Sequence, residues 1–289
     1  LENICKSFDG KTLLKDFSYT FKKGEKIGLI GRNGAGKSTL LNIIMEQLKP
    51  DAGRVKTGET VVYGYYSQMG MTLPEDKRVI EVVKDIAEYV ETGDGNWMGV
   101  SQFLNHFQFT GAKQHSFVSK LSGGEKKRLY LLTILLKNPN FLILDEPTNG
   151  LDPNGIIEIR DLLKKLNETL GVSIIISSHL LTEIEKLVSH VGIISKGRMV
   201  FQGTLESLVN KQQQNASLVV DTSNLPLSTE IARQFEPAAT TGNGKLIMPV
   251  PSKEIIAAIN HAFVKAGIDV YEMSSNKKDL ESIFMELIK

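Results

Sequence analysis

The sequence contains almost no cysteine, no excess of charge of either sign and no long hydrophobic run. Its single cysteine, Cys5, excludes an intramolecular disulfide and a cysteine metal cluster, which is typical of a reducing compartment. With 34 basic and 33 acidic residues, the formal net charge of +1 favours neither nucleic acid nor an anionic membrane. The longest apolar stretches, such as 129–136, fall far short of the ~20 residues that a membrane span needs. We therefore expect no nucleic-acid partner, and membrane association only through a partner chain.

The remaining composition is that of an ordinary globular protein, with 41% hydrophobic and 23% charged residues. A chain of 289 residues can bury a sizeable core and is long enough for one large or two smaller domains. It begins at Leu1, without methionine, inside what reads as a first strand. We therefore expect a cut N-terminus and leave an upstream domain open.

The first third of the chain has the pattern of strands that lead into a helix. Alternating and apolar runs within 1–31, separated by Asp9-Gly10 and Lys23-Gly24, predict strands joined by tight turns. A helix is expected from about Lys37 to Leu48, ended by the following Pro50. After a strand ending near Tyr66, the stretch from Leu73 to Leu136 is patterned as helix, with a glycine-containing break at 92–99.

Two later runs, FLILD and VSIIIS, are short, continuous and apolar. Such strands between helices predict a parallel sheet covered on both faces. A polar stretch at 210–217 is suited to a linker, so we expect a main domain over 1–209 and a small C-terminal α/β domain over 218–289. In that domain the strand-like runs SLVVD, KLIMPV and DVYEM alternate with helix-like segments from Ser228, Ser252 and Lys278.

A glycine-rich loop, GRNGAGKST, lies between a predicted strand and a predicted helix. Its Gly-x4-Gly-Lys-Ser spacing is the P-loop pattern, whose backbone N–H groups and helix N-terminus bind phosphates. Lys37 is expected to reach the β- and γ-phosphates, and Ser38 to bind Mg²⁺. The predicted ATP-binding residues here are Gly31, Asn33, Gly34, Ala35, Gly36, Lys37, Ser38 and Thr39.

A second pattern, FLILDEP over 141–147, is an apolar strand that ends in two acids. An aspartate at this end of a parallel strand lies where α/β sheets bind ligands, so Asp145 is expected to hold the metal through its water shell. Glu146 is then placed to orient or deprotonate an attacking water as a general base. Alone, two exposed carboxylates that begin a turn explain the pattern equally well, but the neighbouring P-loop favours the metal and base interpretation.

A third pattern, LSGGE over 121–125, begins a helical run. Ser122, Gly123 and Gly124 form a second helix N-terminus with free N–H donors, which is a second candidate phosphate site. An ordinary capped helix is the alternative for this motif by itself.

The LSGGE motif between a P-loop and an LILDEP strand resembles the ABC ATPases over residues 1 to about 208. The resemblance implies a P-loop NTPase of the ABC cassette fold, with an antiparallel β subdomain and a helical subdomain at about 70–136. It also implies a head-to-tail dimer with a second ABC cassette. In that dimer the P-loop of one cassette and the LSGGE of the other enclose each ATP with its Mg²⁺.

Further positions match the family one at a time. Phe8 stands where an aromatic ring stacks on adenine, with a core phenylalanine as the alternative. Gln68 matches the glutamine that senses Mg²⁺, and Asp152 matches the aspartate that crosses the dimer interface. His179, which follows an apolar strand, matches the histidine that contacts the γ-phosphate. The resemblance thus implies a catalytic set of Glu146, His179, Gln68 and Lys37, and a magnesium set of Ser38, Gln68 and Asp145.

The resemblance divides near residue 149. Upstream segments such as LSGGEKKRLYLLTILLKNPNFLILDEPTN are similar to ABC-F proteins, soluble twin-cassette ATPases that act on ribosomes. Downstream segments, including GLDPNGIIEIRDLLKKL and the ending DLESIFMELI, are similar to ATPase subunits of bacterial drug or lantibiotic-type exporters. Gly150 and Leu180-Leu181 depart from the ABC-F pattern, which has Asp and Asp-Arg there. Two hypotheses follow: a junction of two lineages, natural or an assembly artefact, or a single divergent exporter ATPase.

Two functions remain open at this point. The resemblance favours an ATP-hydrolysing subunit of an exporter of drugs or peptide antibiotics, cytoplasmic and peripheral at the inner face of the cell membrane. A separate transmembrane permease is then expected to dock near Gln68 and the helical region from Leu73 to Leu136. The alternative is a fragment of a soluble ABC-F ATPase, acting in translation or antibiotic resistance.

Overall fold

The computed structural model describes residues 1–67, 72–91, 97–213, 217–276, 284–285 and 287. The chain divides into two compact units, a cassette unit containing Leu1–Leu205 and a C-terminal unit, Glu206–Met285. The expected domain limits at 209 and 218 stay a prediction, and helix α8 (Leu205–Gln213) covers the first half of the expected linker. Within the described ranges, no helix has both the length and the apolar composition that crossing a bilayer requires.

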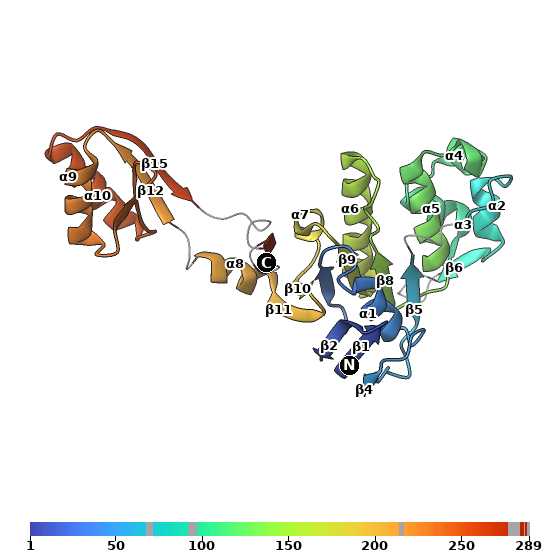
Figure 1. The fold of residues 1–289 in the computed structure, drawn as a ribbon. Helices are drawn as coiled ribbons and strands as arrows, with labels where there is room; N and C mark the ends of the chain where they lie inside the picture. The colour runs from blue at the N-terminus through green and yellow to red at the C-terminus, as the bar shows by residue number, and fades with distance from the viewer. Residues whose placement is uncertain (68–71, 92–96, 214–216, 277–283, 286, 288–289) are drawn as a thin grey trace. The chain divides into compact units, whose positions relative to one another are not determined.

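The cassette unit is built around a six-stranded sheet (Figure 1). Its strand order is β11-β10-β3-β9-β8-β5, with β10, β3, β9, β8 and β5 parallel and β11 antiparallel to β10. The strands are β3 (Lys26–Ile30), β5 (Tyr63–Tyr66), β8 (Phe141–Asp145), β9 (Ser173–Ser178), β10 (His190–Ser195) and β11 (Arg198–Thr204). Every residue of β8 and β9 is buried, as the continuous apolar runs predict.

A smaller antiparallel sheet, in the order β2-β1-β4, lies in the same unit. Its strands are β1 (Glu2–Phe8), β2 (Lys11–Phe17) and β4 (Ala52–Arg54). The buried side chains of Ile4, Leu14 and Phe17 belong to one core cluster with Leu40 and Leu41 of helix α1 (Lys37–Ile44). The expected antiparallel subdomain is therefore confirmed, and its core contacts fix it beside the P-loop helix.

Helix α1 (Lys37–Ile44) is four residues shorter than predicted. Glu46 has a φ of 59°, a left-handed conformation that stops the helix before the expected end at Leu48. Helix α6 (Pro153–Leu170) begins after the Asp152 N-cap and ends at Gly171, and α7 (Leu181–Ile184) is a single turn.

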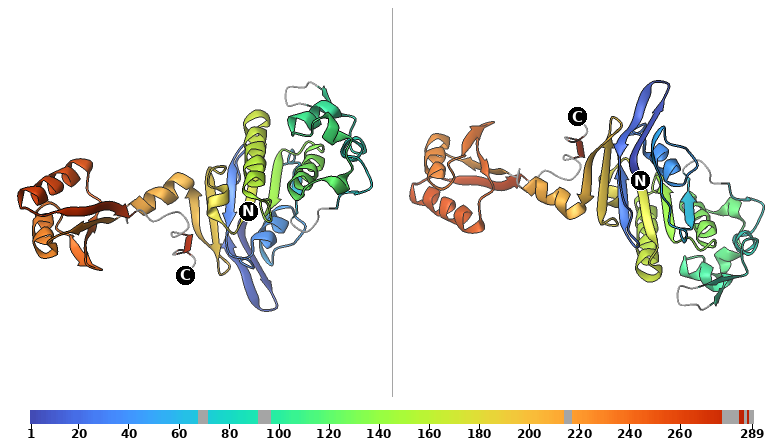
Figure 2. Two further views of the ribbon diagram at one scale, coloured as in Figure 1. Left: turned by 90° about the horizontal axis from the view of Figure 1, so that it is seen from above. Right: turned by 90° about the horizontal axis from the view of Figure 1, so that it is seen from below.

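Among its described residues, the helical region contains four α-helices and a 3-10 turn, gathered on one side of the cassette unit in both views of Figure 2. These are α2 (Val79–Lys84), α3 (Val100–His106), α4 (Gly111–Gln114), η1 (Val118–Lys120) and α5 (Gly123–Leu135). The predicted helix was wrong at Tyr89–Glu91, which form strand β6 and pair antiparallel with β7 (Trp97–Gly99), a strand inside the predicted break at 92–99. Aromatic and β-branched residues such as Tyr89, Val90 and Trp97 favour strands, which outweighs the helical periodicity there.

The C-terminal unit has the order β-α-β-β-α-β with an antiparallel sheet β13-β14-β12-β15, the ferredoxin-like arrangement. Its elements are β12 (Ser217–Thr222), α9 (Leu225–Phe235), β13 (Thr240–Gly242), β14 (Lys245–Pro249), α10 (Lys253–Lys265) and β15 (Val270–Asn276). Leu218, Val220, Leu246, Ile259 and Phe263 form its core. A small α/β domain is thus confirmed.

Two of the three expected C-terminal helices are present. One begins after the Ser252 N-cap as predicted, and the other begins at Leu225, before the predicted Ser228, because the Asn224 side chain caps it. The expected start at Lys278 lies outside the described residues.

Candidate functional site

The P-loop joins the buried strand β3 to helix α1, as the sequence predicts. Gly36 has a φ of 104°, and a Cβ atom there would lie 2.7 Å from the Leu13 carbonyl oxygen, so only glycine fits. The loop lines a cleft of about 270 Å³ together with Leu13 and Glu146. The predicted residues that line it are Asn33, Gly34, Gly36, Lys37, Ser38 and Thr39. Gly31 and Ala35 belong to the same loop and do not line the cleft.

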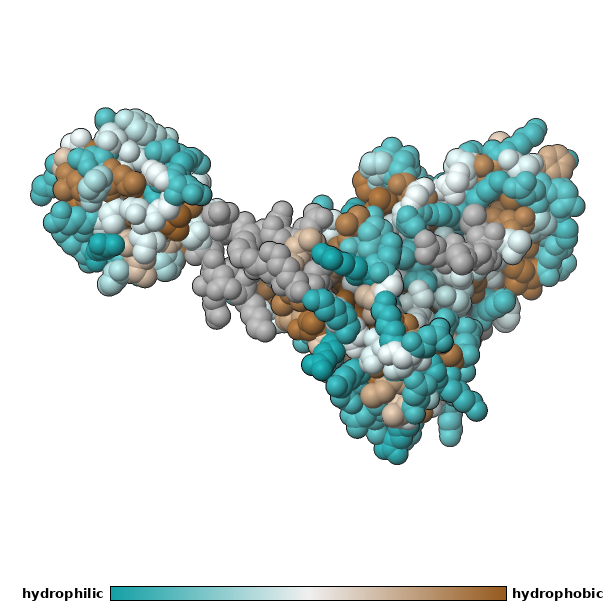
Figure 3. Space-filling view, viewed as in Figure 1, coloured by the Kyte–Doolittle hydropathy of each residue, from teal (hydrophilic) through white to brown (hydrophobic). Residues whose placement is uncertain are grey.

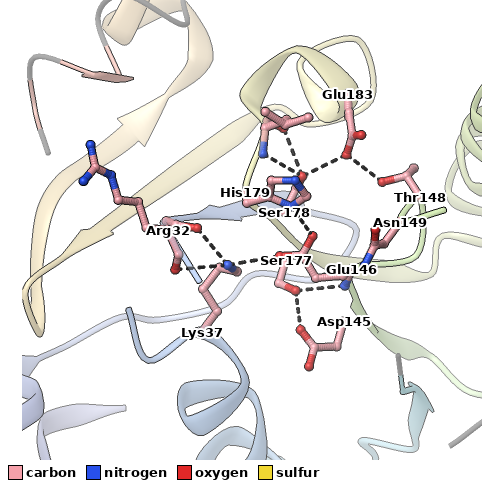
Figure 4. A network of polar contacts seen from close by, with 12 residues as sticks. Arg32, Lys37, Asp145, Glu146, Thr148, Asn149, Ser177, Ser178, His179 and Glu183 are labelled. Atoms are coloured by element: carbon pink, nitrogen blue, oxygen red, sulfur yellow. Dashed lines mark hydrogen bonds and ion pairs between the residues drawn. The ribbon is translucent and has the colours of Figure 1, made fainter. Parts of the chain in front are cut away.

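Lys37 connects the P-loop to the predicted general base (Figure 4). Its Nζ atom donates a hydrogen bond to the Gly31 carbonyl oxygen at 2.7 Å and lies 3.0 Å from Glu146 Oε1. Both side chains are more than nine-tenths buried, at 6% and 7% exposed. The contact is an ion pair without hydrogen-bond geometry, since Glu146 Oε1 has no hydrogen-bond partner among the described residues. A phosphate oxygen that enters this cleft therefore meets an ammonium group already facing a carboxylate.

Ser177 of strand β9 links the two predicted acids at the end of the neighbouring strand β8. Its hydroxyl donates to Asp145 Oδ1 and accepts from the Glu146 backbone N–H at 3.0 Å. Asp145 and Glu146 are both buried, at 5% and 6% exposed, and Glu146 adopts a left-handed φ of 50°. The serine therefore fixes the Asp145 carboxylate and the backbone from which the Glu146 side chain projects.

His179 follows β9 directly and reaches the same carboxylate. Its Nδ1 atom lies 2.8 Å from Glu146 Oε2, with the donor set by the imidazole tautomer. The structure thus brings together three residues predicted from separate motifs, Lys37, Glu146 and His179. This arrangement places one carboxylate between two groups that can be cationic, which suits a base beside phosphate.

The protein groups near the P-loop fit a magnesium–nucleotide ligand by their donor chemistry. Mg²⁺ prefers oxygen ligands, keeps several waters, and is commonly held by one or two carboxylates plus substrate phosphates. Ser38 supplies a hydroxyl in the cleft and Asp145 a carboxylate at the end of β8. Among the described residues, no cluster of three or more acidic, histidine or cysteine side chains could hold a metal ion by itself. Gln68, the third predicted ligand, lies outside the described residues.

The LSGGE residues lie in a different cleft, of about 380 Å³. Ser122 is the N-cap of α5, where its hydroxyl accepts from the Glu125 N–H and the Glu125 carboxylate accepts from the Ser122 N–H. Asp152, the N-cap of α6, lines the same cleft and accepts from the Gly155 N–H at 3.0 Å. One chain therefore groups Ser122, Gly123, Gly124 and Asp152 in one cleft and the P-loop with Glu146 in another.

Phe8, the predicted adenine contact, lies at the end of β1 with 44% of its surface exposed. Lys6 Nζ lies 5.2 Å from the centre of its ring, a cation–π contact. The exposed ring argues against the alternative of a core phenylalanine, and its role in nucleotide binding stays a prediction.

Several residues around the two clefts were missed by the sequence interpretation. Helix α5, which begins in the LSGGE motif, is the signature helix. Its Arg128 donates from Nη1 to Gln108 and forms an ion pair with Glu158, which joins the signature helix to α6. Lys127 donates to the Asn149 carbonyl oxygen in the loop between Glu146 and Asp152, and burial lowers the pKa of its ammonium group. The one local signal for these missed contacts is the serines at the end of the apolar strand β9, because buried hydroxyl groups need hydrogen-bond partners.

Comparisons with known proteins agree with this geometry. The family model described as ABC transporter matches residues 14–149, and one described as "AAA domain, putative AbiEii toxin, Type IV TA system" matches 114–185. Among solved structures, the ATP-binding cassette MJ0796, a dimeric post-hydrolysis state bound to ADP and Pi, has a TM-score of 0.57 and 25% sequence identity. The match covers 71% of this chain and 97% of MJ0796.

Curated relatives match over different lengths. The uncharacterized ABC transporter ATP-binding protein YhcH of Bacillus subtilis is 30% identical, over 99% of this chain and 94% of YhcH. The bacitracin transport ATP-binding protein BcrA of Enterococcus faecalis is 29% identical, over 99% of this chain and 95% of BcrA. The uncharacterized ABC transporter ATP-binding protein YfmR of Bacillus subtilis is 37% identical over 73% of this chain, which spans only 33% of the length of YfmR.

The fold and the P-loop cleft define a P-loop ATPase with the architecture of an ATP-binding cassette. Together with relatives that match along nearly the whole chain, they place the protein in a family. The chain belongs to the ABC transporter ATP-binding proteins.

Proposed function

We propose that this chain is the energising subunit of an ABC exporter for drugs or peptide antibiotics. The observation that carries the proposal is a match to YhcH and BcrA along 99% of the chain, which includes the C-terminal unit. BcrA is named for bacitracin transport, so a peptide antibiotic is the substrate class that this likeness favours. The proposed work is transport driven by ATP binding and hydrolysis.

The separation of the two clefts supports a head-to-tail dimer as the working unit. The P-loop cleft contains Lys37 and Glu146, whereas Ser122 and Asp152 lie in the other cleft. A second cassette is then needed to bring a signature helix to each P-loop, and the similar cassette MJ0796 was solved in a dimeric state. The partner is a second copy of this chain or a similar cassette.

The residues of the P-loop cleft take distinct roles in the proposed reaction. Mg²⁺ bound with ATP neutralises charge on the phosphates and polarises the γ-phosphoryl group. Lys37 would bind the phosphate oxygens. Ser38 would hold the metal directly, and Asp145 would hold it through water. Glu146 would accept a proton from the attacking water. His179, which lies 2.8 Å from Glu146, would orient that carboxylate and contact the γ-phosphate. The proposed adenine contact is Phe8, and Gln68 is proposed to complete the magnesium set.

A permease docking surface is proposed on the helical region. An apolar cavity of about 190 Å³ lies among α3, the end of α5 and the second half of α6. Its apolar lining includes Phe103, Phe107, Leu135, Leu162, Leu166 and Leu170. Figure 3 shows further hydrophobic side chains exposed over this side of the cassette unit. A helix from a transmembrane permease suits such a groove, and it would hold the chain at the inner face of the cell membrane.

The second candidate is a fragment of an ABC-F ATPase that acts on ribosomes. It is favoured by the sequence likeness upstream of residue 149 and by the 37% identity to YfmR, of which this chain spans a third. Against it, a relative of matching length accounts for the C-terminal unit. A junction of the two lineages near LDEPTN would reconcile both likenesses. For a natural fusion, single long sequencing reads of the gene are expected to contain both parts, joined across codons 140 to 155. Reads in which the two parts are not joined would contradict it.

Co-purification separates the two candidates. We expect the chain to fractionate with membranes when it is expressed with the permease encoded by a neighbouring gene. Association with ribosomes, and not with membranes, would overturn the exporter proposal in favour of the ABC-F one.

A further inference from the structure

Glu183 lies on the single-turn helix α7 and joins the ends of two neighbouring strands (Figure 4). Its Oε2 atom accepts a hydrogen bond from Thr148 Oγ1 at 2.7 Å and lies 3.0 Å from Ser178 Oγ. Thr148 follows β8 and is 5% exposed, and Ser178 ends β9 and is fully buried. One carboxylate oxygen therefore bridges two buried hydroxyls that come from different strands.

Each of these hydroxyls stands beside a residue of the proposed reaction. Thr148 is two residues after Glu146, and Ser178 immediately precedes His179. Between the two strand ends, Glu146 Oε2 and His179 Nδ1 are 2.8 Å apart. Any displacement of one strand end relative to the other therefore changes the distance between the base and the histidine.

The backbone around Glu146 needs such support. Glu146 has a φ of 50°, and left-handed non-glycine residues persist only where the surroundings hold them. Ser177 fixes the segment from the side of Asp145, and Glu183 fixes it from the side of Thr148. Without an acceptor at position 183, the Thr148 hydroxyl loses its partner and the segment can relax.

We propose that Glu183 is a positioning residue, which holds Glu146 and His179 in the geometry needed for ATP hydrolysis. This inference rests on the proposed role of Glu146 as general base. Glu183 acts through Thr148 and Ser178 and does not contact the nucleotide. Its removal should therefore lower kcat while leaving ATP binding by the P-loop nearly unchanged.

The test compares Glu183→Ala with Glu183→Gln in steady-state ATPase assays of the full chain. We expect Glu183→Ala to lower kcat by about 10- to 100-fold, since a misplacement of ~1 Å costs about 100-fold. The KM for ATP and the Kd of a fluorescent ATP analogue should change less than about twofold, because the P-loop contacts that bind ATP are unchanged. Glu183→Gln keeps an oxygen acceptor and should retain most of the activity.

A companion pair of changes at Thr148 keeps the test decisive if Glu183→Ala folds poorly. Thr148→Val should reproduce the loss of kcat, whereas Thr148→Ser, which keeps the hydroxyl, should not. Glu185→Ala is the matched control at the C-cap of α7, because the Glu185 side chain makes no hydrogen bond or ion pair among the described residues. Thr148→Val combined with Glu183→Ala should lower kcat little further than either change alone.

Equal kcat values for wild type, Glu183→Ala and Thr148→Val would overturn the inference. So would a loss seen only as a lower melting temperature or a raised KM, because that pattern indicates a purely structural role. Failure of the proposed function has a different signature: wild type without ATPase activity, or Glu146→Gln with unchanged turnover.

Discussion

The ammonium group of Lys37 lies 3.0 Å from Glu146 Oε1, so the predicted phosphate-binding residue and the predicted base form one buried ion pair. The two residues come from different motifs, 109 positions apart by their numbers, and meet because β3 and β8 flank β9 in the sheet. Phosphate oxygens entering the cleft compete with Glu146 for the ammonium group. Nucleotide binding is therefore expected to release the Glu146 carboxylate for its work as a base.

Breaking this pair on one side should destabilise the fold. Lys37→Met leaves Glu146 buried beside an uncharged side chain, and losing one partner of a buried pair typically costs about 3–5 kcal/mol. Urea unfolding without nucleotide should record this loss, and a second change, Glu146→Gln, should restore much of it. Additive effects of the two changes would contradict the coupling.

Gly36 should tolerate no side chain. Gly36→Ala combines a φ of 104° with a Cβ atom 2.7 Å from the Leu13 carbonyl oxygen, so we expect ATP binding at least about tenfold weaker. Gly10→Ala is the matched control, because Gly10 also has a positive φ, 77°, with no atom near the added Cβ. That change should cost about 1 kcal/mol of stability and leave the Kd for ATP unchanged. Equal effects of the two changes on Kd would refute the steric explanation.

Ser177 should matter for chemistry as well as for stability. Ser177→Ala removes the buried donor to Asp145 Oδ1 and the acceptor of the Glu146 N–H, at a cost of about 1–3 kcal/mol. Ser173→Ala, at the other end of β9, removes the acceptor of the Gly24 N–H and should cost a similar amount. Only Ser177→Ala should lower kcat, by about tenfold or more, in an ATPase assay. A normal kcat for Ser177→Ala would show that the bridge is merely structural.

The link between Lys127 and the Asn149 carbonyl should support dimer closure. It ties the signature helix to the loop that runs from Glu146 of one cleft to Asp152 of the other. Lys127→Met should weaken ATP-dependent dimerisation by about tenfold, the equivalent of a charged hydrogen bond of ~1.5 kcal/mol. Lys126→Met, which removes a surface ion pair with Glu75, should have little effect in the same analytical ultracentrifugation experiment. Equal dimerisation constants for Lys127→Met and Lys126→Met would exclude a role of the Lys127–Asn149 contact in dimer closure.

The parts of the site that the sequence could predict are those encoded within one short segment. They are the glycine spacing in the P-loop, the acids at the end of β8 and the N-cap of α5. Each of them requires only local residues and a neighbouring strand or helix. The parallel sheet followed from continuous apolar runs, because strands buried on both faces need no polar alternation.

The rest depends on contacts between residues far apart in the chain. Ser177 meets Asp145, and Glu183 meets Thr148, across 32 and 35 positions, so no local pattern marks either pair. Strand β6 contradicts the predicted helix because short apolar segments have ambiguous periodicity. The early end of α1 likewise depends on the left-handed backbone at Glu46, which composition does not mark.

The most direct test of the account is the behaviour of Glu146→Gln with Mg²⁺ and ATP. The change removes the proposed base and the charge facing Lys37 while keeping the shape of the side chain. ATPase turnover and the mass of the complex by light scattering should be measured on the same sample, with wild type as the control. We expect Glu146→Gln to turn over ATP about 100-fold more slowly than wild type, or slower still, and to form a stable dimer that contains ATP. Turnover equal to wild type, or a monomer that fails to bind ATP, would contradict it.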